Sequence, residues 1–546
     1  GLDSLPLNGR VWYPDGDGPF PLVLIVHGNH NPENFSDPGY EYLGRLLASR
    51  GFILASIDEN FLNGNMRGEN DARGWMLLKH LEAWKAFSDS AGRPFYHKID
   101  WDKLALMGHS RGGEAVADAG LFNRLEHYPD DANVKFKFNF NIKSLVAIAP
   151  VDGQYEPASR PTPLSNYNYL VIHGSHDGDV SSFSGMRQYE RVAFTDTTPH
   201  FKAAVWMYRA NHGQWNTSWG SNDAGQGGRR FLDLRGLIAP ELQREMAEIF
   251  ITSFLEATLN GKKEYFPLFR DHRVAGGWLP KTMYITRFQE SGFHALADYH
   301  EDVDVTTGSA PGVTIAAESL STWKEAPVPL RQRNANMGFN AAWLGWNNHI
   351  AGDDTTKFGT PASYDVTISD SLRTAWHVTA QGVLELSLAP TKDKPGPRKA
   401  PRDTTKKDTT KSKTPAPKKP PPPKPNPEAD TLPIDLSIQA IDAAGDTARV
   451  DLGRYGAIRR PLEMTVLKRR GQDQENFPTL YELILQTYVI PLADFVAAEP
   501  KFDPSRLKTV RILFDRTPQG TVVLSDIGLS AIDPAFLTAA NPGASR

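Results

Sequence analysis

The sequence of 546 residues contains no cysteine, and this absence excludes a whole group of structures and mechanisms. Without cysteine the chain can form no disulfide, bind no metal through thiolates and use no cysteine nucleophile. It also lacks any run of about 18 or more apolar residues, so the sequence predicts no membrane-spanning helix. The formal net charge is only −4, which gives no reason to expect nucleic acid as a partner.

The composition that remains is typical of a globular protein with more than one domain. Hydrophobic residues make up 40% and charged residues 23% of the chain. A chain of this length is too long for a single core and is expected to form two or three domains. The 41 prolines, a spacer rich in Thr, Lys and Pro, and a first residue other than Met favour a processed, secreted or periplasmic protein.

One short stretch, residues 104–117 (LALMGHSRGGEAVA), organises the N-terminal half. An apolar strand pattern leads into the motif Gly108-His109-Ser110-Arg111-Gly112, and a helical pattern of small residues follows directly. A serine placed between glycines in this way can sit on a sharp turn above the end of a sheet, where its hydroxyl is exposed for attack. Ser110 is therefore the candidate nucleophile of a serine hydrolase.

Strand and helix patterns alternate on both sides of this motif. Apolar strands are predicted near residues 21–28, 52–58, 144–150 and 201–208, and segment 169–180 is predicted to be a strand that runs into a loop. Helices are predicted near 40–51, 71–88, 181–194 and 238–259. Such alternation indicates a doubly wound, mostly parallel sheet. We therefore predict an α/β-hydrolase domain over residues 1–275.

The order of the chain then predicts the partners of the serine. In an α/β-hydrolase the acid and the histidine follow the serine, each on a loop beyond the end of a strand. His212, after the last apolar strand, is the candidate general base, and Asp177, after the preceding strand, is the candidate acid. Asp179 and Asp152 are alternatives for the acid, because the position of the acid moves between strand ends in this fold.

Other residues near these loops have predicted roles. The backbone amides of Asn29 and Arg111 are the expected oxyanion donors by position. Trp215 and Trp219 are candidates for the wall of a substrate pocket, although packing explains them equally well. The two histidines at 173 and 176 lack a third ligand at suitable spacing, so no metal site is predicted, and the mechanism needs no cofactor.

The chain also resembles a known family. The segments VHGNH (26–30), ASRGFILASID (48–58), GHSRGGEAVA (108–117), HGSHDGDV (173–180) and ANHGQWNTSW (210–219) are similar to bacterial α/β-hydrolases grouped with cutinase-like polyester hydrolases and chlorophyllases. The elbow has the chlorophyllase form, with arginine where polyester hydrolases have methionine. The resemblance implies carboxylic ester hydrolysis, with Ser110, Asp177 and His212 as the triad and Asn29 and Arg111 as oxyanion donors.

The C-terminal half shows a different pattern. Apolar and polar residues alternate in segments such as 363–370, 383–390, 432–442 and 507–515, which is typical of half-buried antiparallel strands. The strand pair 507–530 is similar to the last strands of galactose-binding-like jelly rolls. We therefore predict an all-β sandwich or jelly-roll domain over 276–546, which could bind a carbohydrate or polymer surface or could be purely structural.

A segment built from Lys, Thr and Pro, residues 391–430, interrupts this region. It cannot bury a core and is expected to be disordered or partly polyproline II. Because the flanking strands alternate cleanly, we interpret it as a long loop within one sandwich. The alternative is a linker between two small domains, 276–390 and 432–546.

Three functional hypotheses follow. The first is an esterase that cleaves small or polymeric carboxylic esters, such as polyesters, through an acyl-enzyme. The second keeps the same triad but cleaves amide or peptide bonds. The third is a polymer-binding protein with an inactive hydrolase domain.

Overall fold

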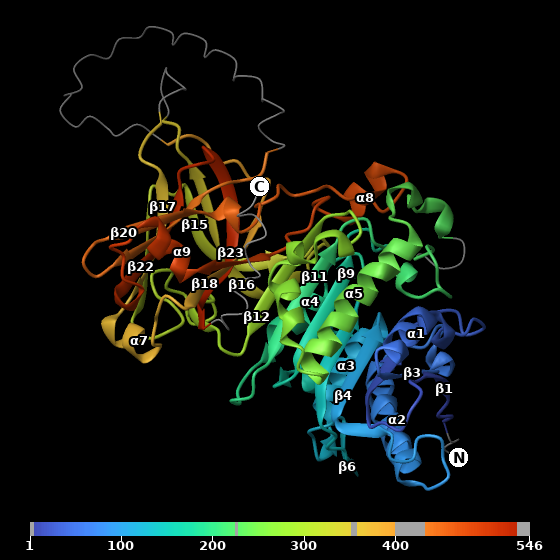
Figure 1. Ribbon diagram of the computed structural model, residues 1–546. Helices are drawn as coiled ribbons and strands as arrows, with labels where there is room; N and C mark the ends of the chain where they lie inside the picture. The colour runs from blue at the N-terminus through green and yellow to red at the C-terminus, as the bar shows by residue number, and fades with distance from the viewer. Residues whose placement is uncertain (1–4, 224–227, 351–357, 399–431, 532–546) are drawn as a thin grey trace, which may run out of the picture.

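Figure 1 shows a computed structural model of the chain, which describes residues 5–223, 228–350, 358–398 and 432–531. The N-terminal part, from blue to green, contains a large sheet with helices around it. The C-terminal part, from yellow to red, consists mainly of antiparallel strands. The two parts lie against each other and correspond to the two classes of pattern in the sequence.

The N-terminal sheet has eight strands. Their order is β1 (Gly9–Trp12), β3 (Ile53–Ile57), β2 (Phe20–Val26), β4 (Ile99–His109), β7 (Ile142–Ile148), β9 (Asn168–Gly174), β11 (Phe201–Met207) and β12 (Tyr284–Glu290). All neighbours from β3 to β11 are parallel, whereas β1 and β12 pair antiparallel at the two edges. The central strands are buried on both faces, which explains their continuous apolar sequences.

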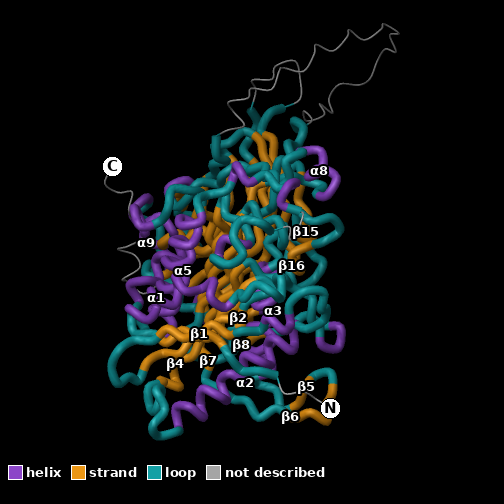
Figure 2. The backbone as a smooth tube through the Cα atoms, turned by 90° about the vertical axis from the view of Figure 1, so that its right-hand side faces the viewer, coloured by secondary structure: helices purple, strands orange, loops and turns teal. Residues whose placement is uncertain are grey.

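Helices cover both faces of this sheet, as Figure 2 shows. One face packs against α2 (Asn70–Asp89), α3 (Arg111–Phe122) and α4 (Gly185–Arg191), and the other against α1 (Glu41–Ser49), α5 (Pro240–Leu259) and α6 (Phe266–Arg270). The apolar faces of these helices form two cores on opposite sides of the strands. The predicted doubly wound α/β architecture is thereby confirmed.

The α/β sheet extends beyond residue 275, where the sequence suggested a boundary. Strand β12 pairs with β11 over its whole length, from Phe201 with Glu290 to Met207 with Tyr284. Its sequence, YITRFQE, contains charged and polar residues and does not resemble the apolar parallel strands. The edge strand is stabilised by the tertiary pairing, which its local pattern does not reveal.

The C-terminal part contains two antiparallel sheets. One has the order β15 (Thr322–Pro329), β16 (Asn336–Asn347), β23 (Gln519–Ala531), β18 (Gly382–Pro390) and β21 (Gln486–Pro491), with β13 (His294–Ala297) also paired to β23. The other has the order β14 (Val313–Glu318), β17 (Ala362–Ile368), β22 (Leu507–Phe514), β19 (Ser437–Asp442) and β20 (Thr447–Asp451). Side chains from both sheets form one hydrophobic core. The predicted all-β region is confirmed, and its assignment as a jelly roll stays a prediction.

Strands on either side of segment 391–430 contribute to both of these sheets. In the first sheet β18 lies between β21 and β23, and in the second β17 and β19 both pair with β22. The strands before and after the segment therefore share the same core. The disorder expected within the segment concerns mostly residues 399–431, which lie outside the described residues.

Short elements complete the described structure. They are β5 (His127–Tyr128), β6 (Asp131–Lys135), β8 (Leu164–Ser165), β10 (Val192–Ala193), α7 (Asp370–Ala375), α8 (Arg470–Asn476) and α9 (Leu492–Ala498). In the ranges that the structure describes, no helix has both the length and the apolar character needed to cross a bilayer.

The two parts of the chain share a continuous interface. Apolar side chains of the β domain, among them Phe339 and Leu483, belong to the same core as Met186 of α4. A buried ion pair joins Arg287 of β12 to Asp526 of β23 at 2.8 Å. This interface lies on the α4 side of the sheet, directly beside the loop that follows β9.

Candidate active site

Ser110 lies at the turn between β4 and α3, in a strained backbone conformation. Its φ of 60° and ψ of −123° are rarely adopted by a residue with a side chain. The surrounding glycines are required by close contacts, because a Cβ on Gly108 would lie 1.8 Å from the carbonyl oxygen of Gly112. A strained serine held at a strand-to-helix turn by such contacts is the geometry expected of a nucleophile elbow.

The loop after β2 lies directly against this elbow. A Cβ added to Gly28 would lie 2.5 Å from the Cβ of Ser110 and 2.9 Å from the amide nitrogen of Arg111. Within the described residues, the backbone amides of Asn29 and Arg111 donate to no backbone or side-chain acceptor. The two predicted oxyanion donors therefore come from segments that meet beside the serine, and their amides are available to a ligand.

Buried polar contacts hold the first of these segments. His27 donates from Nδ1 to the carbonyl of Gly28 at 2.8 Å and accepts at Nε2 from the amide of Glu59 at 3.0 Å. Burial lowers the pKa of His27 to about 3, which keeps the ring neutral and suits both contacts. Arg73, fully buried beneath the loop, donates to the carbonyl of Leu62.

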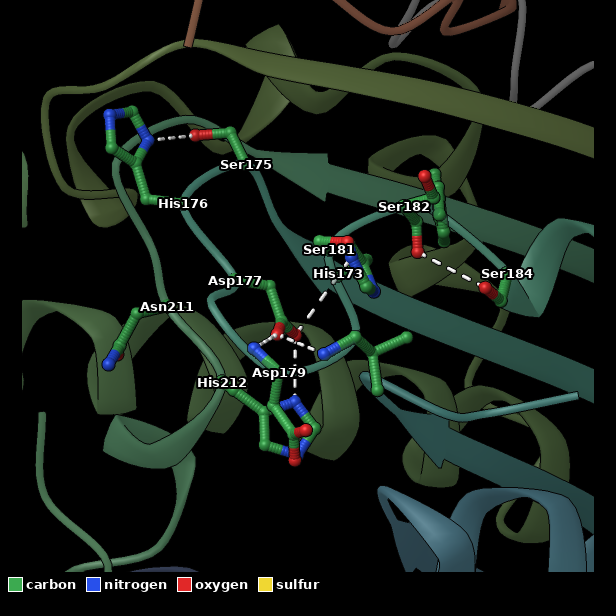
Figure 3. Close-up of polar contacts among 12 residues, drawn as sticks. His173, Ser175, His176, Asp177, Asp179, Ser181, Ser182, Ser184, Asn211 and His212 are labelled. Carbon is green, nitrogen blue, oxygen red and sulfur yellow. Dashed lines mark hydrogen bonds and ion pairs between the residues drawn. The ribbon is translucent and has the colours of Figure 1, made fainter. Parts of the chain in front are cut away.

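The loops after β9 and β11 bring together the predicted acid and base. His212 Nδ1 lies 2.7 Å from Asp177 Oδ2, and both side chains are buried (Figure 3). Asp177 Oδ1 accepts from the amides of Asp179 and Val180, which fixes the carboxylate. An imidazole oriented by a buried carboxylate can act as a general base at its other nitrogen.

That other nitrogen, Nε2 of His212, has no hydrogen-bond partner among the described residues. The bond to Ser110 that a complete triad requires is thus not formed here, although such bonds are often long in enzymes without substrate. The elbow and the base loop are nevertheless in contact, because His109 Nε2 donates to the carbonyl of His212 at 3.1 Å. The carboxylate of Asp179, whose side chain is 55% exposed, lies 3.6 Å from the free Nε2.

The alternative acids occupy different places. Asp179 faces Nε2 rather than Nδ1 of His212. Asp152 forms an ion pair with Arg191 on α4. Neither carboxylate contacts the nitrogen that an orienting acid would hold, so the geometry favours Asp177.

The histidines near the acid are engaged in other contacts. His173 is buried with Nε2 3.9 Å from Asp177 Oδ2, and burial lowers its pKa to about 4. His176 Nδ1 lies 2.6 Å from the hydroxyl of Ser175. Across the described part of the chain, no group of three or more suitable side chains could hold a metal ion.

The two candidate tryptophans differ in position. Trp215 is completely buried in the core on the α5 side of the sheet, so the structure places it in packing rather than in a pocket wall. Trp219 lines a cleft of about 580 Å³ together with His212 and Asn29. Its ring stacks on His30 with the centroids 5.2 Å apart.

Sequence reasoning missed Asp223, which joins the acid and base loops. Its carboxylate accepts from the amides of Gly178, His212 and Gly213 at 2.9 to 3.0 Å and from Asn211 Nδ2 at 2.7 Å. Burial and the charge of Asp177 raise the pKa of Asp223 to about 7. No motif marks this aspartate, since it follows the base by eleven positions in an irregular loop.

The β domain supports the acid loop from the other side. Arg331, which is buried, donates to the carbonyl of Ser181 at 2.8 Å, and the amide of Gln332 donates to the hydroxyl of Ser182. Glu482 accepts from the amide of Phe183 at 2.8 Å. The segment immediately after Asp177 is therefore anchored to residues that lie more than a hundred positions away in the sequence.

We expect Glu482→Ala to lower kcat about tenfold while changing KM little, because it frees the segment that positions Asp177. Glu482→Gln retains an oxygen that can accept from Phe183 and should recover most of the lost kcat. Steady-state kinetics of both variants on p-nitrophenyl acetate, with a melting temperature for each, provide the measurement. An equal loss in both variants would assign the effect to charge rather than to position.

A second prediction concerns pH. Burial by itself lowers the pKa of His212, but the charge and hydrogen bond of Asp177 and the charges of Asp179 and Asp223 outweigh it and raise the pKa to about 9. A general base must be neutral, so activity should fall as pH decreases through this value. Asp179→Asn removes one charge that stabilises the imidazolium of His212. The acid limb of the pH–activity profile should therefore move to lower pH by about one unit.

The measurement is kcat/KM for p-nitrophenyl acetate from about pH 5 to about pH 10, which reports the pKa of the free enzyme. Asp152→Asn serves as the control, since that carboxylate pairs with Arg191 and should leave the profile in place. If the acid limb of the profile moved to higher pH in Asp179→Asn, this would contradict the conclusion that the charge of Asp179 raises the pKa of His212.

The sheet and the strained serine together define an α/β-hydrolase domain. Residues 3–168 match a family model described as Chlorophyllase. This span includes Asn29, Ser110 and Arg111, whereas Asp177 and His212 lie beyond its end. The predicted resemblance to chlorophyllases and cutinase-like hydrolases is confirmed over the N-terminal region.

Three relatives illustrate the similarity. A bis(hydroxyethyl) terephthalate hydrolase of Streptomyces coelicolor is 33% identical over 20% of this chain and 33% of its own length. A cutinase of Thermobifida alba is 29% identical over 19% of this chain and 32% of its own length. Chlorophyllase-2 of Arabidopsis thaliana is 26% identical over 30% of this chain and 46% of its own length. The matches thus span a third to a half of these relatives.

Proposed function

We propose that the chain is a serine esterase that cleaves carboxylic esters through an acyl-enzyme. The observation that carries the proposal is the strained Ser110 at the elbow, next to a loop on which a buried imidazole is held by Asp177 at 2.7 Å. The similarity to proteins named cutinase and chlorophyllase supports an ester substrate, small or polymeric. The composition expected of an exported protein supports action outside the cytoplasm.

In the first step, Ser110 Oγ attacks the ester carbonyl while His212 Nε2 takes its proton. The carbonyl oxygen becomes an oxyanion that the amides of Asn29 and Arg111 stabilise. The intermediate collapses, His212 gives the proton to the departing alcohol, and the acyl group stays on Ser110. Water then attacks the acyl-enzyme by the same sequence and releases the acid.

Asp177 has the supporting role in both steps. It keeps the proton of the neutral imidazole on Nδ1, so that Nε2 presents its lone pair to Ser110. It also stabilises the imidazolium that forms. The free Nε2 in the structure is consistent with this role, since an acceptor is available at the place where the proposal needs one.

The test combines labelling and kinetics of the full chain. A fluorophosphonate should form one adduct, located by mass spectrometry on the peptide that contains Ser110. Pre-steady-state hydrolysis of p-nitrophenyl acetate should show a burst of p-nitrophenol. Faster cleavage of the matching p-nitroanilide would favour an amidase, and the absence of both labelling and turnover would overturn the proposal in favour of a binding protein.

A further inference from the structure

The cleft at His212 has an unusually polar wall. Thirteen described residues line its volume of about 580 Å³, and five of them are asparagines. Apart from glycines, the others carry hydroxyl, imidazole or carboxylate groups, with Trp219 as the single exception among the described residues. Most small-molecule sites are lined mainly by apolar side chains, so this composition indicates a particular kind of substrate.

Trp219 itself offers little apolar surface to a ligand. The side chain is 8% exposed. Its ring stacks on His30 with an interplanar angle of 6° and on His212 with an angle of 15°. Its indole nitrogen donates to the hydroxyl of Ser36. The ring is thus used in packing the histidines.

An apolar substrate would bind poorly in such a cleft. A long acyl chain or a polyester segment gains free energy when it leaves water for an apolar wall. In this cleft, an acyl chain or polyester segment would remove water from amide and carboxylate groups. It would replace none of the hydrogen bonds that the water made to them, which is unfavourable. The wall of the cleft therefore disfavours apolar substituents on both the acyl part and the alcohol part of the ester.

A hydroxyl-rich substrate fits the same groups. The side chains of Asn34 and Asn65 are exposed and make no hydrogen bond to other described residues. Each amide carries both donors and acceptors, and each sugar hydroxyl can donate and accept. By contrast, the side chain of Asn29 is already bound in both directions to Gly64 and serves the loop.

The charged residues of the cleft restrict the class of substrate further. Asp179 and Asp223 line the cleft, and no lysine or arginine is among its described lining residues. The Asp179 carboxylate lies 3.6 Å from the base, so a carboxylate or phosphate on the substrate would be repelled at the reaction centre. A neutral substrate meets no such repulsion.

We propose that the cleft receives the neutral, hydroxyl-rich alcohol part of a short-chain carboxylic ester, as in an O-acetylated carbohydrate. This inference rests on the proposed esterase function and specifies its substrate class. The acyl part is short because the wall offers little apolar surface for a longer one: Trp219, the one large apolar side chain among its described lining residues, is only 8% exposed. The alcohol part is recognised through hydrogen bonds to side-chain amides.

The experiment compares two esters with the same acyl group and the same type of leaving alcohol. Methyl glucoside acetylated at its primary hydroxyl and hexyl acetate are incubated with the full chain, and released acetate is measured. We expect kcat/KM to be at least about tenfold higher for the sugar ester, because only that substrate pairs the amides of the cleft. p-Nitrophenyl acetate is assayed in parallel as a test of the chemistry itself.

Variants sharpen the comparison. Asn34→Leu combined with Asn65→Leu should reduce the preference for the sugar ester toward unity, whereas Asn133→Leu, on the exposed strand β6, should leave it unchanged. Equal or faster cleavage of hexyl acetate, with p-nitrophenyl acetate also cleaved, would overturn the substrate class alone. No cleavage of any of the three esters would overturn the esterase function and this inference with it.

Discussion

Ser110→Ala is expected to lower kcat/KM for p-nitrophenyl acetate by about 10⁴- to 10⁶-fold, because it removes the atom that forms the acyl-enzyme. The folded structure should persist. The replacement is small and keeps the buried backbone contacts of the elbow, such as the amide of residue 110 with the carbonyl of Ile148 at 2.9 Å. The measurements are steady-state kinetics, fluorophosphonate labelling and the melting temperature.

The chain offers a matched control for this variant. Ser56 on β3 is also completely buried, and its hydroxyl has no hydrogen-bond partner among the described residues. Ser56→Ala should therefore keep full labelling and full activity. If Ser110→Ala retained the rate of the parent protein, another residue would carry the chemistry.

Asp177→Asn is expected to lower kcat by about 10⁴-fold at neutral pH with little change in KM. The amide has nearly the same size, so the loop should stay in place through the contacts of Asp223 and Glu482. However, an amide that donates to Nδ1 leaves the proton of the ring on Nε2, and the ring then has no lone pair for Ser110. The decrease thus reports the orientation of the base.

Asp179→Asn is the informative comparison, because the two carboxylates are two residues apart and both approach His212. We expect it to keep or raise the activity at neutral pH, since it lowers the pKa of the base. Measuring kcat for both variants at one neutral pH distinguishes them. A large loss in Asp179→Asn with little loss in Asp177→Asn would exchange their roles.

Much of the α/β domain could be predicted because its signals are local. The elbow needs small residues within two positions of Ser110, and this requirement is visible in the sequence itself. Strands buried on both faces have continuous apolar sequences, so the segments that became β2, β7 and β9 were recognisable. The positions of Asp177 and His212 followed from the order of these strands.

The sequence predicted the structure less well for strands whose formation depends on the strands they pair with. Strands β12, β13, β15 and β16 contain alanines, glycines, charged residues or prolines, and no clear period marked them. Strand β16, for example, includes Gly338 and Gly345 and is stabilised by its neighbours β15 and β23 on both sides. Their formation depends on long-range hydrogen bonds that no local window contains.

The sequence by itself predicted the elbow, the parallel sheet and the chain order of the candidate residues Ser110, Asp177 and His212, because each depends on residues close together or on the direction of the chain. Only the tertiary structure decided that Asp223 joins the acid and base loops, and that Arg331 and Glu482 anchor the acid loop from the second domain. It also decided that Trp215 is buried while Trp219 borders a polar cleft. These contacts join segments that are far apart in the chain, and they form only when the chain folds and the two domains pack together. The local sequence around each residue therefore does not indicate them.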